Sequence, residues 1–391
     1  MPTALFAGNP TTGASGRPQP QTADYASPGP FVAHARPASR PGYQNTIAGG
    51  AGGAVTQAQV ITQALASAPG YLRRLDLTWA LAGGTTTTAA FTADAPYNLA
   101  AFLTLKDAWG TPVLAGGGYE MQLLVPKFSG QLWLFNQGDV SALPSFSSVV
   151  AGTGAFTVRS AVVIEATKGY GVLSIGNQSV LPTMTINTNP LATVLSGTLT
   201  TPGALTLIVD EPYYDIDPAM PVEPPGLGST LQWTQVNGNQ TVAANTVNRI
   251  QLPRTGGYLT TLIAELRDST GARNDTYVSG AGRLKLYIDG VPYMDETFLE
   301  VGDRMAGQFG FTAANLRPNG VFAYTFKDSL SQVSLGLFDS LQTVLLTNPG
   351  TLLELEGVPW GNGTNSPATV TAVIGQLVPT GPLQQGLIEA A

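Results

Sequence analysis

The sequence predicts an all-β protein of two domains, and three observations support this prediction. Apolar and polar residues alternate with a period of two in several segments, which is typical of strands with one buried face. The 391 residues include 46 glycines and 29 prolines, which favour many short elements joined by turns over long helices. A weak internal repeat relates the two halves of a chain that is too long for one small core.

The alternation is clearest at 71–81, where Leu75, Leu77, Trp79 and Leu81 are separated by single, mostly polar residues. The same pattern recurs at 155–165, 282–288 and 369–377. Shorter β-rich runs, most of them separated by Gly, Pro or Asn, lie at 119–125, 131–135, 204–209, 231–236, 258–267, 321–326, 341–346 and 351–356. At 55–66 the apolar residues fit a helical period, and we expect one short helix there.

The repeat is visible in two places. The segment Pro69–Leu72 and the strand after it are matched by Gly256–Leu259 and a second apolar run. Further along, Leu103–Pro112 parallels Leu284–Pro292, and each reads as a strand, a tight turn built on Asp and Gly, and a return strand. The repeat therefore predicts two domains with the same order of strands.

A proline-rich stretch divides the two copies. The segments Asp210–Pro218 and Met220–Gly226 contain five prolines, which predicts a stiff, extended linker and not a strand inside a sheet. We place the first domain at 54–218, the linker at 219–228 and the second domain at 229–380. Each domain is long enough for an eight-stranded jelly-roll β-barrel.

The two ends of the chain differ from the domains. Residues 1–53 are rich in Pro, Gly, Ser and Ala and show little periodicity, so they are expected to form an irregular N-terminal arm. Two interpretations stay open, an arm that orders against a partner and a disordered tail. Residues 381–391 are taken as a C-terminal tail.

The composition excludes several classes of function. Charged residues make up only 11% of the chain and the formal net charge is −7, which argues against a basic nucleic-acid-binding protein. The absence of cysteine removes disulfides and thiolate zinc sites, and the single histidine leaves little room for a Ser/His/Asp triad. We expect no secretory signal and no membrane-spanning helix. The balance favours a structural protein over an enzyme, with no catalytic residues, metal site or cofactor.

Three arginines of the arm are the candidate contact residues. Arg17, Arg36 and Arg40 are suited to acidic lipid headgroups or to acidic groups of neighbouring subunits, and the sequence leaves both open. His34 titrates in a range suited to an assembly switch, but a solvated position in the arm is the simpler interpretation.

Other motifs are interpreted structurally. The acidic sets Asp215/Asp217 and Asp295/Glu296/Glu300 lack the spacing of a calcium loop, and we expect solvated carboxylates. Gly116–Gly118 lacks the Lys-Ser/Thr of a phosphate loop and is predicted to form a hairpin. Sequons begin at Asn239, Asn274 and Asn362, and without a signal sequence they carry no prediction. The tryptophans are expected to serve core and interface packing: Trp79, Trp109, Trp133, Trp233 and Trp360.

Together, the stretches Pro69–Leu72, Leu103–Asp107 and Tyr213–Pro218 and the tandem domains resemble one family. These are the double jelly-roll major capsid proteins of tailless icosahedral viruses with an internal membrane, which include tectivirus-like phages and, more distantly, the adenovirus hexon. The resemblance covers roughly 54–380 in element order and length and rests on no signature motif. The arm departs from the family, in which it is often helical.

The resemblance implies a double jelly roll that acts as a homotrimer, a pseudo-hexagonal tile of six barrels in a virion shell assembled in the host cytoplasm. Its implied partners are neighbouring capsomers, minor capsid or penton proteins and an inner membrane lipid, with no specific nucleic acid. Loops 136–154 and 302–320 are expected at exposed or inter-capsomer positions. The arm and the tail are expected to tie tiles to each other and to the layer beneath.

Two other classes of function stay open. One is a carbohydrate-binding or adhesive β-sandwich protein of a phage fibre or cell surface. The other is a hydrolase on tandem jelly rolls, which requires a pair of carboxylates at a fixed separation.

Overall fold

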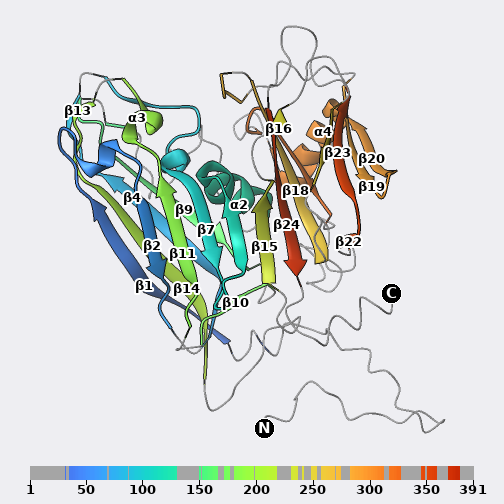
Figure 1. Cartoon of the computed structure of the whole chain (residues 1–391), viewed down its shortest axis with the longest axis horizontal. Helices are drawn as coiled ribbons and strands as arrows, with labels where there is room; N and C mark the ends of the chain where they lie inside the picture. Colours follow the sequence, from blue (N-terminus) through green and yellow to red (C-terminus); the bar gives the residue numbers. More distant parts are fainter. Residues whose placement is uncertain are drawn as a thin grey trace.

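The structure is a computed structural model of the whole chain (Figure 1). It describes residues 31, 35–67, 70–86, 88–129, 149–150, 152–165, 171–176, 180–197, 199–217, 230–236, 240–241, 248–252, 257–268, 270–273, 282–311, 317–326, 345–347, 350–358 and 369–378. Among these residues, no helix is both long enough and apolar enough to cross a membrane.

The first domain is a jelly roll of two four-stranded layers. One layer has the order β1 (Ala35–Ile47), β14 (Leu205–Ile216), β4 (Arg74–Leu81) and β9 (Phe156–Val163), with β3 (Gly70–Leu72) and β10 (Leu173–Ser174) continuing β4 and β9. The other has the order β2 (Val60–Ala64), β11 (Thr183–Thr188), β7 (Ala100–Lys106) and β8 (Pro112–Gly116). All pairs within these layers are antiparallel.

The second domain repeats this order. One layer consists of β15 (Thr230–Gln235), β24 (Thr369–Val378), β18 (Gly257–Arg267) and β21 (Val321–Thr325), with β16 (Gln240–Thr241) beside β24 and β22 (Leu345–Thr347) beside β18. The other consists of β17 (Asn248–Gln251), β23 (Leu353–Val358), β19 (Arg283–Ile288) and β20 (Val291–Thr297). The predicted fold, two tandem eight-stranded jelly rolls, is confirmed.

Short elements complete the chain. The helical segments are η1 (Ala54–Thr56), η2 (Tyr97–Leu99), η3 (Glu120–Leu124, a π-helical turn), α2 (Val125–Phe128), α3 (Leu191–Val194) and α4 (Phe298–Phe309). Two small ribbons pair β5 (Thr85–Thr86) with β13 (Leu199–Thr201) and β6 (Ala90–Phe91) with β12 (Leu195–Ser196).

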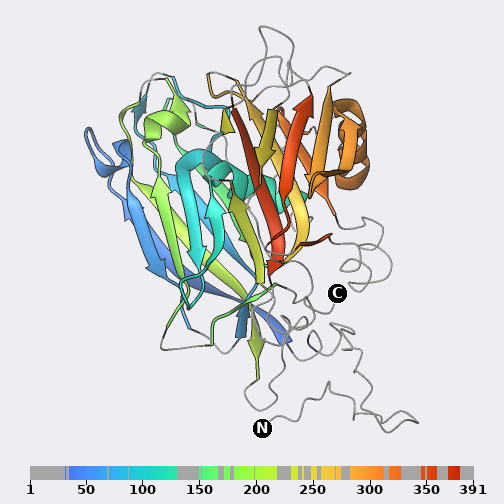
Figure 2. The ribbon, with the colours of Figure 1, turned by 45° about the vertical axis from the view of Figure 1, so that its right-hand side comes forward.

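The two jelly rolls share one sheet. Strand β8 of the first pairs in parallel with β15 of the second, with Leu114 opposite Trp233 and Ala115 opposite Thr234. The β2–β11–β7–β8 layer of the first domain therefore continues into the second domain as one ten-stranded sheet. Figure 1 shows this sheet from β2 across to β18, and Figure 2 shows it turned by 45°. A single hydrophobic cluster extends through both domains, from Trp79 and Leu103 to Leu286 and Val373.

The internal repeat occupies equivalent positions. Gly70–Leu72 and Gly257–Leu259 begin the third strand of each jelly roll, and each is followed by an irregular residue, Arg73 and Thr260. The hairpins β7–β8 and β19–β20 match residue for residue, because Leu105 faces Leu114 and Leu286 faces Met294, with a one-residue bulge directly after each pair. The sequence alignment of Leu103 with Leu284 is thus also a structural alignment.

Part of the segment expected to be an irregular arm is a strand. Residues Ala35–Ile47 form β1 and pair with β14 along its whole length. Within the described residues β1 has no partner on its other side, and an edge strand tolerates prolines such as Pro37 and Pro41. Residues 1–30 and 32–34 lie outside the described part of the chain.

The proline-rich stretch was also misread in part. Asp210–Ile216 belongs to β14, a central strand, and not to a linker. Pro212 is accommodated because its carbonyl accepts a hydrogen bond from the backbone N–H of Arg73, the residue at which β3 and β4 are interrupted. Its missing N–H therefore falls where the ladder is already broken. The linker at 219–228 and the tail at 381–391 lie outside the described residues.

Three helix and strand predictions were wrong. The helix expected at 55–66 is the short turn η1 followed by β2, in which the β-branched run Val60–Thr62 favours a strand. The run 119–125 is helical, since a short apolar run does not distinguish strand from helix. The expected loop 302–320 begins inside α4, whose start carries a capping box of Thr297 and Glu300.

Candidate functional site at the junction of the two jelly rolls

The junction begins where β8 ends. Gly116–Gly118 does not form the predicted hairpin but leads from β8 directly into η3. A Cβ on Gly118 would lie 2.2 Å from the carbonyl oxygen of Ala100, so only glycine fits this close approach. The side-chain oxygen of Gln235, on β15, accepts a hydrogen bond of 2.5 Å from the N–H of Gly117. The turn is therefore held by the other jelly roll.

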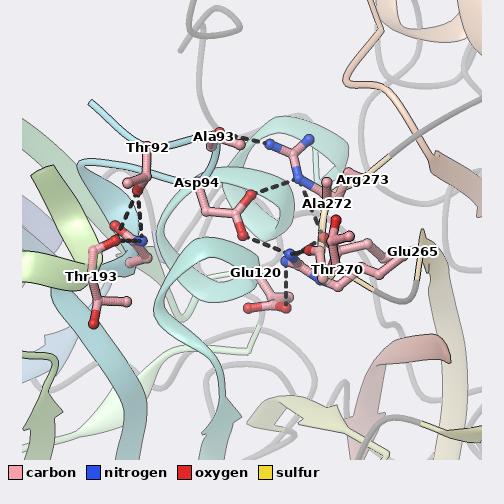
Figure 3. A network of polar contacts seen from close by, with 12 residues as sticks. Thr92, Ala93, Asp94, Glu120, Thr193, Glu265, Thr270, Ala272 and Arg273 are labelled. Atoms are coloured by element: carbon pink, nitrogen blue, oxygen red, sulfur yellow. Dashed lines mark hydrogen bonds and ion pairs between the residues drawn. The ribbon is translucent and has the colours of Figure 1, made fainter. Parts of the chain in front are cut away.

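Ion pairs join the two domains next to this turn (Figure 3). Asp94, from the loop between β6 and η2, accepts hydrogen bonds from Arg267 Nη1 at 2.6 Å and from Arg273 Nε at 2.8 Å. Both arginines belong to the second jelly roll, and all three side chains are largely buried. Arg273 also donates to the carbonyl of Ala93 at 3.0 Å. One carboxylate of the first domain thus binds two guanidinium groups of the second.

A local turn positions the arginines. Asp268 Oδ1 accepts hydrogen bonds from the backbone N–H groups of Thr270 and Ala272, at 2.8 and 3.0 Å, directly after β18. Gly271 adopts a positive φ of 82°, which favours glycine. The turn brings Arg273 back beside Arg267, and its guanidinium stacks 4.1 Å from the ring centre of Tyr119.

Glu265 is the most deeply buried acid of this group. Arg267 Nη2 lies 2.6 Å from its Oε1, yet neither Glu265 oxygen accepts a hydrogen bond of normal geometry from a described residue. Glu120 of η3 lies beside the same guanidinium, 3.9 Å from Nη2. Burial, reinforced by the negative charge of Glu120, raises the pKa of Glu265 well above its ordinary value, although Arg267 and Arg273 oppose this shift.

The charges balance when one of the acids holds a proton. Three carboxyl groups, Asp94, Glu120 and Glu265, face two arginines, and burial, which raises the pKa of Glu265, favours the protonated form of that acid. Burial also raises the pKa of Tyr119, so its ring stays neutral beside Arg273.

This arrangement is suited to holding the two domains together. Each acid is engaged by arginine, and within the described residues no group of three or more His, Cys, Asp or Glu side chains is placed to hold a metal ion. The junction combines shared strands, charge-assisted hydrogen bonds and a stacked guanidinium. The two jelly rolls are thus joined by backbone pairing, ion pairs and ring stacking together.

The arginines named from the sequence are separated by the structure. Arg36 lies exposed on β1 opposite Asp215, whereas Arg40 is turned into its own domain. Arg40 pairs with the buried Glu211 at 2.6 Å and also donates to the carbonyl oxygens of Ser67 and Ala66. Arg17 and His34 lie outside the described residues.

The acidic sets have structural partners. Asp295 pairs with Arg283 at 2.5 Å, Glu296 with Arg304 at 2.8 Å, and Glu300 caps α4. These carboxylates, expected to be solvated, are thus engaged in ion pairs or a helix cap. Asp215 lies on β14 and Asp217 directly follows that strand.

The tryptophans divide into two groups. Trp79 is buried and donates to Gln122 at 3.1 Å, and Trp233 is buried with its ring over Gly375. Trp109 is exposed at the tip of the β7–β8 hairpin. Trp133, Trp360 and the three sequon asparagines lie outside the described residues.

None of the charged residues at the junction was singled out from the sequence. Asp94 and Arg273 lie in loops, and no spacing relates them to each other or to Glu120. One signal was present: Glu265 is a lone acid in the apolar run Leu262–Leu266, and a buried charge in a strand needs a partner.

Comparison with solved structures identifies the fold. The chain is similar to the major capsid protein of Sulfolobus turreted icosahedral virus, with a TM-score of 0.58 and 14% identity over 90% of this chain and 99% of that one. It is similar to the PBCV-1 virus capsid protein, with a TM-score of 0.54 and 13% identity over 87% and 92% of the two chains. No protein-family model and no curated protein matches the sequence.

These similarities define the class: the chain has the double jelly-roll fold of viral major capsid proteins. A PBCV-1 protein fitted into the virophage Sputnik agrees, with a TM-score of 0.56 and 13% identity over 88% of this chain and 93% of that one. The resemblance inferred from the strand pattern is therefore confirmed at the level of the fold.

Proposed function

We propose that the chain is a major capsid protein, three copies of which form a pseudo-hexagonal capsomer in the shell of an icosahedral virus. The observation that carries the proposal is the match of both jelly rolls, in one arrangement, over nearly the full length of two viral major capsid proteins. A shared single domain would carry far less weight, since one jelly roll serves many functions.

The flank of the first jelly roll supports this proposal. The outer face of the β2–β11–β7 layer carries the row Val60, Asn187 and Phe102, in which Val60 and Phe102 are exposed apolar side chains. The next row consists of Thr62, Thr185 and Thr104. A nearly uncharged sheet face of this kind is suited to coverage by another protein surface.

The low charge of the whole chain has the same explanation. With 11% charged residues, a lone molecule would have little to solvate its sides, whereas barrels packed against each other need fewer charges there. A closed assembly also covers exposed strand edges such as β1. The proposed location is therefore the virion shell, with neighbouring capsomers and minor capsid or penton proteins as partners.

We assign the arm a tethering role within this proposal. Arg17 and the exposed Arg36 are suited to acidic groups, either on neighbouring subunits or on a lipid layer beneath the shell. Arg40 is a weaker candidate, since its guanidinium is already engaged by Glu211.

Imaging of the purified full-length chain by electron cryomicroscopy tests the proposal. We expect discrete particles with threefold symmetry and six barrels in a pseudo-hexagonal outline. A glycan array separates the adhesive alternative: specific glycan binding by single, unassembled molecules would contradict the capsid role.

A further inference from the structure

The two strands that pair at the junction inside the chain, β8 and β15, each have an equivalent strand in the other jelly roll whose edge is unpaired within the described residues. Strand β8 is covered by β15, and the chain continues from β8 into η3 and α2. The equivalent of β8 in the second jelly roll is β20, and the equivalent of β15 in the first is β1. Within the described residues, β20 pairs with β19 alone and β1 with β14 alone. Each chain therefore presents one unused edge of each kind.

Residue equivalence shows which side chains are left uncovered. The hairpin alignment makes Val113 equivalent to Tyr293, since both are the bulged residue of their hairpin. Extended past the strand ends, it makes Tyr119 equivalent to Leu299. Val113 and Tyr119 are 2% and 3% exposed at the internal junction, whereas Tyr293 and Leu299 are 49% and 64% exposed. Equivalent positions are thus buried in the first jelly roll and exposed, with large hydrophobic side chains, in the second.

From this contrast we infer that β20 and the start of α4 form a docking surface for β1 of a second copy of this chain. The contact repeats the internal β8–β15 junction between subunits and so deepens the proposed function, on which it rests. It is heterologous, because a different surface is used on each side, and such contacts form a closed ring when the rotation allows. Three chains provide six equivalent junctions, three internal and three between subunits.

The start of α4 is acidic. The exposed side of α4 carries Glu300 and Asp303. By the repeat, Glu300 is equivalent to Glu120, which lies against Arg267 at the internal junction.

The equivalence also fixes a register that can be tested. The pairing of β15 with β24 and of β1 with β14 places Ser39 where Trp233 lies, and Trp233 is opposite Leu114. Leu114 is equivalent to Met294. Ser39 of one copy is therefore expected within one residue of Tyr293 of the next.

Cross-linking tests this register directly, since the chain has no cysteine of its own. The double variant Ser39→Cys/Tyr293→Cys, treated with a short bismaleimide, is expected to give covalent dimers and trimers on a denaturing gel. The single variants lack one of the two thiols and are expected to give no trimer. The pair Ser39→Cys/Trp109→Cys is the matched control, because Trp109 is 82% exposed at the tip of the other hairpin.

A charge substitution tests the same surface without cross-linking. Leu299→Glu places a charge on the docking surface, yet an acid in the first turn of α4 favours the helix. We expect folded monomers, by circular dichroism and native mass spectrometry, whereas Trp109→Glu stays trimeric. A wild-type trimer that does not cross-link at 39/293 and survives Leu299→Glu would overturn this inference and leave the capsid proposal intact. A wild-type monomer would overturn both.

Discussion

Asp94 of the first jelly roll lies 2.8 Å from Arg273 of the second, and the same carboxylate accepts a second bond from Arg267. One carboxylate of the first jelly roll therefore holds two guanidinium groups of the second, beside the sheet that the two domains share. Asp94→Asn removes the charge from a largely buried site and leaves two arginines with less compensation. We expect a loss of about 2–3 kcal/mol in the free energy of unfolding, measured by denaturant titration at fixed protein concentration.

The matched control for this variant is Asp295→Asn. Asp295 also pairs with an arginine, Arg283, but both side chains are 41% exposed, and solvent-exposed pairs contribute little. We expect no resolvable change in its unfolding midpoint. Equal losses of unfolding free energy in the two variants would contradict the claim that the buried Asp94 pairs stabilise the chain more than an exposed ion pair does.

Glu265 makes the stability of the chain depend on pH with a definite sign. Its pKa is raised in the folded protein, so above about pH 4.5 the unfolded chain has lost a proton that the folded chain still binds. The free energy of unfolding should therefore fall as the pH rises from about 4.5 toward the folded pKa, by up to about 1.4 kcal/mol per pH unit. Glu265→Gln, which mimics the protonated acid, should flatten this part of the profile.

Glu300 is the control of opposite sign. Hydrogen bonds from the backbone and then the side chain of Thr297 lower the pKa of Glu300, so its contribution is lost only as the pH falls through that value. Glu300→Gln should alter the acid end of the profile alone. An unchanged profile for Glu265→Gln would show that Glu265 is ionised in the folded chain.

Gly375 tests the packing of the shared sheet. A Cβ at this position would lie 2.4 Å from the ring of Trp233, so Gly375→Ala forces the indole or β24 to shift. Overpacking of this kind costs about 1–3 kcal/mol, which thermal unfolding measures as a lower Tm. Gly302→Ala is the contrast, since no atom lies within 4 Å of a Cβ there and the residue is inside α4. We expect this variant to gain about 0.5–1 kcal/mol.

Two N-terminal deletions separate the arm from the first jelly roll. Removing residues 1–30 leaves β1 complete, and we expect a folded trimer that does not form shells. Removing residues 1–45 also deletes nearly all of β1, and with it the ion pair of Arg40 with Glu211. We expect that protein to be insoluble or monomeric. Normal particles from the shorter deletion, seen by electron microscopy, would refute the tethering role.

Much of the fold was accessible from the sequence because alternation and duplication are local signals. Strand β4 was visible in Leu75–Leu81, and the matched hairpins at Leu103 and Leu284 gave the correct equivalence of the two domains. Strand β1 was missed because it is an edge strand with two prolines and mostly solvent-facing residues. Pro212 led to a wrong prediction for a related reason. A proline is tolerated in this central strand because the neighbouring strand is interrupted at Arg73, which is 139 positions earlier in the chain.

The junction was not accessible in the same way. Asp94 and Arg273 are 179 residues apart, and only the pairing of β8 with β15 brings their loops together. That parallel pairing has no counterpart in local composition. The difference in exposure between Val113 and Tyr293 likewise indicates a docking surface only once the structure shows that the two positions are equivalent.

The central claim is that the chain is one third of a closed ring of six jelly rolls. Native mass spectrometry of the purified full-length protein tests it most directly. We expect one dominant species at three times the chain mass of 40.5 kDa, which persists on dilution. A stable species at the mass of a single chain, at the same concentrations, would contradict it.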